Sequence, residues 1–402
     1  MSAELKQMIA ENILFAKEAA DYLGVSIQRL HQLTHAGQIT PLKQSGSGTL
    51  FYKQDLEERK KSIQSIGKTT VKRGSFEPMK IDSDLKQEAL NYFTVQAFFK
   101  NSDKKTAPIF EKLKLEIDAT KPLVDNKNIV ADYLNISIEM LEAEYFNTFN
   151  GFKLLKQSDI ILKKGEEGYP ERLAVTDTAP PFIFARGNID LLKEKIVAVV
   201  GTRQPSENGK QSAYRLSEIL GRYNIVVASG LARGIDTQAH TAAVDHNNCM
   251  TVSVIGTSLA KAYPVENSKL QELISEKGLV ISQFAPSEKV QRWFFPMRNA
   301  VMSGISLATV VIEAGETSGA LKQADYALKQ GRYVFIPQSA LDNEAIKWPR
   351  KYIQRPGAYS FRKINELLEK LQNIDILKTS TEKDIALFNG SMEEAELSLI
   401  HI

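Results

Sequence analysis

The most regular pattern of apolar and polar residues lies between positions 196 and 331. Short apolar runs at residues 196–200, 225–228 and 251–255 have the length and composition of buried parallel strands. Each run ends in glycine together with small hydroxyl residues, and polar residues follow. This repeat predicts an α/β fold with an extended Rossmann-like parallel sheet, whose carboxyl edge carries a polar crevice.

The strand-end loops favour the binding of phosphate groups. Glycine lets the backbone approach a phosphate closely, and the following helix offers N–H groups and the positive end of its dipole. Arginines stand in these loops and in a later Arg-Asn pair, and a guanidinium can hold a phosphate through two hydrogen bonds. The predicted phosphate-binding residues are Gly201, Thr202, Arg203, Ser229, Gly230, Arg233, Gly234, Arg298 and Asn299. Ordinary tight turns of a doubly wound sheet are the alternative interpretation.

Several motifs in this region have the order and spacing of a known family. They are Tyr169-Pro170-Glu171-Arg172-Leu173, Gly201-Thr202-Arg203, residues 229–236 with Ala239-His240, Tyr263-Pro264 with Asn267, Phe295-Pro296-Met297-Arg298-Asn299, Glu313-Ala314, Ser318-Gly319 and Gly331-Arg332. Over residues 165–340 the chain resembles the DNA-processing protein A family (DprA, also called Smf). The resemblance implies an extended Rossmann fold that binds single-stranded DNA, forms a homodimer and delivers the strand to the RecA recombinase.

The N-terminal residues show a second pattern. Residues 16–23 predict a helix, residues 27–36 a second helix behind the turn at Gly24, and residues 39–51 a hairpin around Gly46-Ser47-Gly48. This order resembles the winged helix-turn-helix of excisionase/MerR-type DNA-binding domains. The predicted duplex-DNA contacts on the second helix are Gln28, Arg29, His31 and Gln32. A helical hairpin that binds another protein is the alternative.

Changes of pattern predict the domain boundaries. We expect a winged helix-turn-helix at 1–66, a linker at 67–82, a small helical domain at 83–150, the Rossmann-like domain at 151–365, and a C-terminal helix and tail at 366–402. A chain of 402 residues is long enough for several domains that each bury a core.

The composition of the chain limits which ligands and compartments we expect. The net charge of +3 is small, so local basic patches matter more than the total. The single cysteine, Cys249, cannot form an intramolecular disulfide and suits a reducing compartment. The histidines and Cys249 lack the spacing of a metal site, and no apolar run reaches the length of a membrane span. We therefore expect a cytoplasmic protein with no metal, other cofactor or membrane partner.

Two classes of function stay open from the sequence. The first is a DNA-binding recombination mediator, as the resemblance implies. The second is an antitoxin or phage-defence regulator, which binds its own operator and neutralises a toxin enzyme or senses a nucleotide. No catalytic residue is predicted, because Asp236 and His240, four apart on one helix face, have no nucleophile or metal cluster beside them. Hydrolysis of a bound nucleotide with help from Glu313 stays open.

Overall fold

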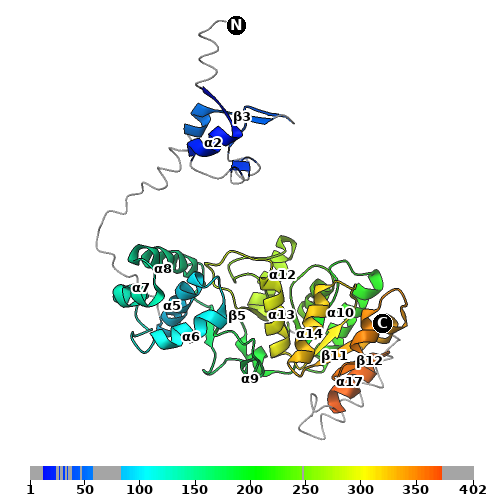
Figure 1. Cartoon of the computed structure of the whole chain (residues 1–402). Helices are drawn as coiled ribbons and strands as arrows, with labels where there is room; N and C mark the ends of the chain where they lie inside the picture. Colours follow the sequence, from blue (N-terminus) through cyan, green and yellow to red (C-terminus); the bar gives the residue numbers. More distant parts are fainter. Residues whose placement is uncertain are drawn as a thin grey trace. The chain divides into compact units, whose positions relative to one another are not determined.

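A computed structural model describes residues 12–23, 27, 30–31, 34, 39–45, 48–57, 83–246 and 249–373. The chain divides into two compact units, Met1–Glu77 and Pro78–Ile402 (Figure 1). Each unit is described by itself.

The first unit contains a small sheet and helix α2. Its elements are β1 (Ile13–Phe15), α2 (Ala16–Leu23), β2 (Lys43–Ser45) and β3 (Gly48–Tyr52). Strand β3 pairs antiparallel with both β1 and β2, so the hairpin that the alternation at 39–51 predicts is present. Ala19, Ala20, Leu30 and Phe51 form its core. The turn after α2 lies outside the described residues, so the helix-turn-helix stays a prediction.

The second unit begins with a group of helices whose ends follow capping chemistry. These are α5 (Asp84–Phe98), α6 (Asp103–Leu113), the 3-10 turn η1 (Leu123–Asn126), α7 (Lys127–Leu134) and α8 (Ile138–Phe152). Helices α5 and α8 begin at Ser83 and Ser137, whose hydroxyls accept hydrogen bonds from the backbone N–H of Lys86 and Met140. Helix α7 ends at Asn135 in the left-handed conformation, a common way for a helix to stop.

These helices share an aromatic core with the edge of the large sheet. Phe93 of α5 lies with its ring centroid 5.3 Å from that of Phe184 in β5, and Phe152 of α8 lies 5.7 Å from the same ring. All three side chains are buried. Figure 1 shows α5 to α8 gathered at the β5 end of the sheet. The helical segment therefore belongs to the same compact unit as the sheet.

The large sheet is the α/β architecture that the strand pattern predicts. Its strands are β4 (Ile160–Lys163), β5 (Phe182–Gly187), β6 (Ile196–Val200), β7 (Val226–Ser229), β8 (Thr251–Val254), β9 (Leu279–Ser282), β10 (Ala308–Val311), β11 (Tyr333–Pro337) and β12 (Ala358–Phe361). The described strands are ordered β12-β11-β10-β6-β7-β8-β9-β5-β4. The pairs from β12 to β9 are parallel, whereas β5 and β4 are antiparallel additions.

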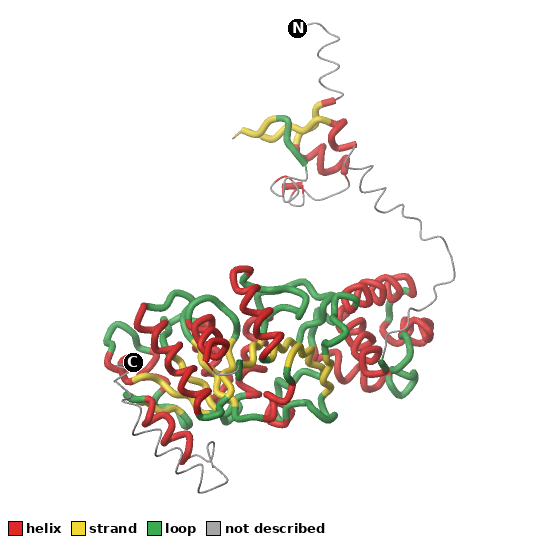
Figure 2. Tube along the Cα trace, turned by 180° about the vertical axis from the view of Figure 1, so that it is seen from behind, coloured by secondary structure: helices red, strands yellow, loops and turns green. Residues whose placement is uncertain are grey.

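Helices cover both faces of this sheet, as Figure 2 shows from behind. The helices and 3-10 turns of this part are α9 (Glu171–Ala174), η2 (Ile189–Lys193), α10 (Glu207–Arg222), α11 (Ile235–His246), η3 (Val265–Asn267), α12 (Ser268–Lys277), α13 (Phe294–Ile305), α14 (Gly319–Lys329), α15 (Gln338–Asp342), α16 (Trp348–Tyr352) and α17 (Ile364–Asn373). Val197 and Val199 of β6 pack with α10, α11 and α17, and Ile196, Ala198 and Val200 pack with α13 and α14. Within the described residues, no helix is long and apolar enough to cross a membrane.

The strand order reverses beside β6. The chain runs outward through β7, β8 and β9, then returns to place β10 on the other side of β6. Loops from the carboxyl ends of β6 and β10 therefore leave in opposite directions and open a crevice between them, the usual ligand position in such sheets.

Loss of the aromatic core between helices and sheet should destabilise the whole second unit. We expect Phe184→Ala to lower the free energy of unfolding by about 3–5 kcal/mol, because the ring is fully buried and its removal leaves a cavity. Urea unfolding followed by circular dichroism measures this. The control Leu115→Ala, at a side chain that is 84% exposed, should change stability by less than about 0.5 kcal/mol. Equal stabilities of the two variants would contradict the shared core.

Candidate functional site

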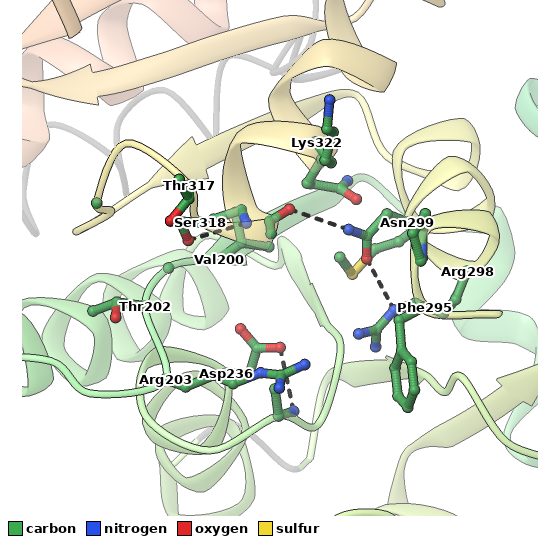
Figure 3. Close-up of a pocket in the computed structure, with 18 residues that line it drawn as sticks. Val200, Thr202, Arg203, Asp236, Phe295, Arg298, Asn299, Thr317, Ser318 and Lys322 are labelled. Atoms are coloured by element: carbon green, nitrogen blue, oxygen red, sulfur yellow. Dashed lines mark hydrogen bonds between the residues drawn. The ribbon is translucent and has the colours of Figure 1, made fainter. Parts of the chain in front are cut away.

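A cavity of about 500 Å³, here called the first cavity, lies at the carboxyl ends of β6 and β10. Its lining comes from the loop after β6, the start of α11, α13, and the loop that leads into α14. In Figure 3, Thr317 and Ser318 lie on one side of it and Phe295, Arg298 and Asn299 on the other. The lining also includes Gly201, Thr202, Arg203, Ala232, Asp236, Gly319, Lys322 and Gln323. The topology therefore places a crevice lined by both polar and apolar groups at the switch point.

A second cavity of about 470 Å³ adjoins the first. Arg203, Ala232, Phe295 and Arg298 line both. The second cavity adds Tyr263, whose ring centroid lies 5.4 Å from that of Phe295, at 50° between the ring planes. Basic and aromatic side chains therefore meet in this cavity.

Backbone hydrogen bonds join the three strand-end loops. The Thr202 N–H donates to the Glu313 carbonyl oxygen at 2.7 Å, and the Ile235 N–H donates to the Thr202 carbonyl oxygen at 3.3 Å. Gly234 has a φ of +80°, and a Cβ there would lie 2.4 Å from the Thr202 carbonyl oxygen. Glycine is required at this position both for its backbone conformation and for the close approach of the two loops.

Two carboxylates of the protein accept hydrogen bonds from backbone N–H groups before helices α10 and α11. Glu313 accepts hydrogen bonds from the Ser206 hydroxyl, at 2.8 Å, and from the Ser206 N–H at the start of α10. Asp236 accepts from the N–H groups of Gly230 and Ala232 at 3.2 and 3.3 Å, in the loop before α11. These three N–H groups are therefore engaged by the protein itself, and the phosphate-binding role of the strand-end loops stays a prediction.

Arg298 lies beneath the crevice and holds the loops in place. Its Nη1 donates to the carbonyl oxygens of Gly230 and Val254, and its Nε donates to Asn299 Oδ1 at 3.0 Å. Burial lowers the pKa of the guanidinium to about 10, although the nearby charge of Asp236 opposes this effect. A Cβ at position 230 would lie 2.1 Å from Nη1, so Gly230 is needed for this packing.

The Asp236 carboxyl is the buried counterpart of Arg298. Burial raises its pKa, whereas the charge of Arg298 and the two backbone N–H donors favour its ionised form. Because most of the Arg298 donors already have protein acceptors, Arg298 serves mainly to position the loops around the crevice.

Arg203 is the cation most available to a ligand. Its side chain is exposed, it lines both cavities, and within the described part of the chain no hydrogen bond or ion pair engages it. Arg233 is also exposed but pairs with the exposed Glu266. An exposed ion pair of this kind contributes little to stability, so a phosphate can compete for Arg233.

The structure gathers most of the predicted phosphate-binding residues. Gly201, Thr202, Arg203, Arg298 and Asn299 line the first cavity, and Gly230 and Arg233 line the second. Gly234 lines neither of them, and Ser229 is buried and donates its hydroxyl to the Val199 carbonyl oxygen at 2.7 Å.

The predicted duplex-DNA residues lie in the first unit. His31 is exposed in a helical segment. Gln28, Arg29 and Gln32 lie outside the described residues.

Sequence reasoning did not assign several residues that line the cavities. They are Tyr263, Phe295, Thr317, Ser318, Lys322 and Gln323. A usable signal existed for Tyr263, Phe295 and Ser318, since each stands in one of the motifs that have the order and spacing of the known family. The contact between Tyr263 and Phe295 was not predictable from these motifs, because it depends on how two separate loops fold.

The candidate acid–base residues have structural roles. His240 is fully buried, and its Nδ1 lies 2.8 Å from Thr251 Oγ1. Burial lowers the pKa of His240 to about 3, so the imidazole is neutral at physiological pH. Among the described residues, no group of three or more His, Cys, Asp or Glu side chains is arranged to hold a metal ion.

The buried imidazole should make stability depend on pH. The His240 pKa is lower in the folded protein than the ordinary value of 6.5, so the unfolded chain takes up a proton that the folded chain does not. The stability of the fold with a neutral His240 is therefore fully present above pH 6.5, and it is progressively lost as the pH falls toward 3. Between pH 6.5 and 5 we expect a loss of about 2 kcal/mol in unfolding free energy, which His240→Gln should lack.

Urea unfolding of both proteins at a series of pH values measures the difference. Buried carboxyl groups titrate in both proteins, so the difference between the two curves isolates the imidazole. Parallel curves would show that His240 is not held neutral by the fold.

Comparisons of the sequence with known proteins agree with the architecture. The sequence model of the family described as DNA recombination-mediator protein A matches residues 160–372, the segment that carries both cavities. The DNA processing protein DprA of Streptococcus pneumoniae is 39% identical over 211 residues, which cover 52% of this chain and 70% of that protein. Protein Smf of Escherichia coli K12 is 33% identical over 213 residues, covering 53% of this chain and 56% of that protein.

A solved structure shows the same fold. The X-ray structure of DNA processing protein A from Streptococcus pneumoniae superposes with a TM-score of 0.51 at 31% identity, over 64% of this chain and 87% of that chain. The family match spans more than half of the present sequence. The chain belongs to the DNA recombination-mediator protein A family.

Proposed function

We propose that the protein binds single-stranded DNA in the first and second cavities and acts as a recombination mediator, without catalysing a reaction. The observation that carries this proposal is the position of Arg203, an exposed cation that lines both the first cavity and the second, where the aromatic pair Tyr263 and Phe295 lies. Membership of a recombination-mediator family supports the biological setting.

The chemistry of the two cavities suits an unpaired strand. Tyr263 and Phe295 offer aromatic faces on which unpaired bases stack, and every base has such a face, so binding needs no particular sequence. Arg203 and Arg233 offer guanidinium groups for phosphates. Cavity volumes of about 470 and 500 Å³ are within the range for ligands of nucleotide size, whereas the bases of a duplex are stacked inside the helix.

Removal of the Arg203 charge should weaken single-strand binding in a salt-dependent way. We expect Arg203→Gln to lower affinity for an oligothymidine about 10–100-fold, the usual worth of a hydrogen bond to a charged group. The slope of log affinity against log salt should become shallower by about 0.7, because one phosphate contact is lost. Fluorescence anisotropy at several salt concentrations measures both quantities.

Two comparison variants separate charge from stacking. Arg222→Gln removes an arginine at the other end of α10, 60% exposed and paired with Glu218, and should leave both quantities unchanged. Phe295→Leu should lower affinity while the salt slope stays the same, because stacking involves no counterion. A folded Arg203→Gln protein with unchanged affinity and slope would refute the proposed site.

We infer that the first unit is a second, duplex-DNA-binding module. The observations that support this are the β2–β3 hairpin, the buried Leu30 of a helical segment, and the exposed His31 on the same segment. This module is also what the alternative function requires, namely an antitoxin or defence regulator that binds its own operator and neutralises a toxin enzyme.

Footprinting of the intact protein upstream of its own gene tests this module. As a homodimer, the protein should protect two inverted half-sites about one helical turn apart, since a two-fold protein reads a two-fold site. Replacement of His31 by Ala should weaken this protection and leave single-strand binding intact. Absence of any protected duplex would make the first unit a protein-interaction module.

We further infer that the second unit forms a homodimer and passes its strand to a RecA-type recombinase. Family membership supports both inferences. Light scattering of the intact chain measures its association. For the partner, gel filtration should detect a complex with RecA that forms only when single-stranded DNA is present. Absence of this complex would mean that the protein binds the strand but does not deliver it to RecA.

A further inference from the structure

A third cavity, of about 780 Å³, lies where the turn between α5 and α6 meets α13. From the sheet side it is lined by Trp293, Met297 and Tyr326. From the helical side it is lined by Lys100, Asn101 and Lys104. Both Lys100 and Asn101 have a positive φ, at 55° and 57°, a conformation that is uncommon for residues other than glycine. The turn is therefore held in an unusual backbone shape where it borders this cavity.

Helix α13 connects the third cavity with the other two. Phe295 and Arg298 belong to the lining of the first and second cavities, whereas Trp293 and Met297, on the same short stretch, belong to the third. Phe294 between them is buried and stacks on Phe284, with ring centroids 4.0 Å apart and planes at 9°. This stack anchors the start of α13, so the flanking aromatic rings are presented from a fixed backbone.

Trp293 is a large apolar ring left in solvent. It is 54% exposed although Phe294 beside it is almost fully buried. Tyr326 is half-buried on the facing helix α14, and both Lys100 and Lys104 are exposed. Aromatic rings beside lysines are the combination that binds single strands without sequence preference.

The two acidic residues in the lining of this cavity do not make it unfavourable for a nucleic-acid strand. Asp103 accepts hydrogen bonds from the Tyr92 hydroxyl at 2.7 Å and from the Gln96 amide at 2.6 Å, and burial raises its pKa. Its carboxyl group is therefore already engaged by the protein. Asp177 is exposed at the cavity and balances one of the two lysines. The chemistry favours stacking of a base more than strong attraction of a phosphate.

We propose that the third cavity takes a further nucleotide of the strand that the first and second cavities bind, with its base stacked on Trp293 and its phosphate beside Lys100 or Lys104. This inference rests on the proposed function, because it extends the same strand around the start of α13. It also gives the helical segment a direct part in DNA binding.

Tryptophan fluorescence of the intact protein tests the stacking. The chain has two tryptophans, and Trp348 is buried with its Nε1–H bonded to the Ala314 carbonyl oxygen, so Trp293 provides the solvent-accessible signal. An oligothymidine of about twelve nucleotides should quench the emission, whereas one of about four should quench it little because it fills the first two cavities alone. In Trp293→Phe the quenching by the longer strand should disappear.

Affinity measurements give an independent test. Trp293→Ala should lower affinity for the longer strand about 10-fold and leave affinity for the shorter strand unchanged, the difference expected for one stacked base. Lys104→Gln should weaken binding of the longer strand, whereas Lys105→Gln should not, because Lys105 is also exposed but lies outside the cavity lining. Circular dichroism confirms that each variant is folded.

The outcomes separate this inference from the function on which it rests. If the longer strand binds through Arg203 but leaves the emission and the Trp293→Ala affinity unchanged, the third cavity does not hold DNA and the proposed function stands. If the wild-type protein binds neither strand, both proposals fail. If Trp293→Ala keeps full DNA affinity but loses a protein partner, the cavity is a protein-docking site and the present inference is wrong.

Discussion

The buried guanidinium of Arg298 is the interaction on which the candidate site depends. It reaches from α13 to the carbonyl oxygens that follow β7 and end β8, and its charge faces the buried Asp236. Asp236 in turn holds the N–H groups of Gly230 and Ala232. A buried charge without a partner is strongly destabilising, so each member of this group requires the others. The loops around the crevice are fixed as a consequence, and Arg203 is left exposed at their surface.

This arrangement differs from the usual phosphate-binding loop of a parallel sheet. In that loop, backbone N–H groups at a helix N-terminus hold the phosphate directly. Here Glu313 accepts a hydrogen bond from the N–H of Ser206, the N-cap residue of α10, and Asp236 accepts one from the N–H of Gly230 in the loop between β7 and α11. Arg203, which is exposed and lines both cavities, is a cation that an anion at this edge can reach.

Helix α13 and the residue before it contribute side chains to all three cavities. Its buried residues pack on the sheet, Arg298 fixes the crevice floor, and Phe295 and Trp293 face different cavities. The aromatic core formed by Phe93, Phe152 and Phe184 joins α5 and α8 to the sheet edge. Because of that core, the turn between α5 and α6 is held against the sheet part of the molecule and can complete a cavity with α13.

Local sequence determined the parallel sheet, the strand-end position of the crevice, and the presence of Arg203 and Arg298 within it. These features follow from short apolar runs and from glycine and arginine at fixed places, which act over a few neighbouring residues. Tertiary structure alone decided that Arg298 is buried while Arg203 is exposed, since the two look alike in sequence but meet different neighbours from β7, β8 and α11. It likewise decided that Tyr263 lies beside Phe295, and that Glu313 accepts hydrogen bonds from Ser206, the N-cap residue of α10. Each of these depends on contacts between segments far apart in the chain, and a local pattern carries no information about which distant segment will pack against it.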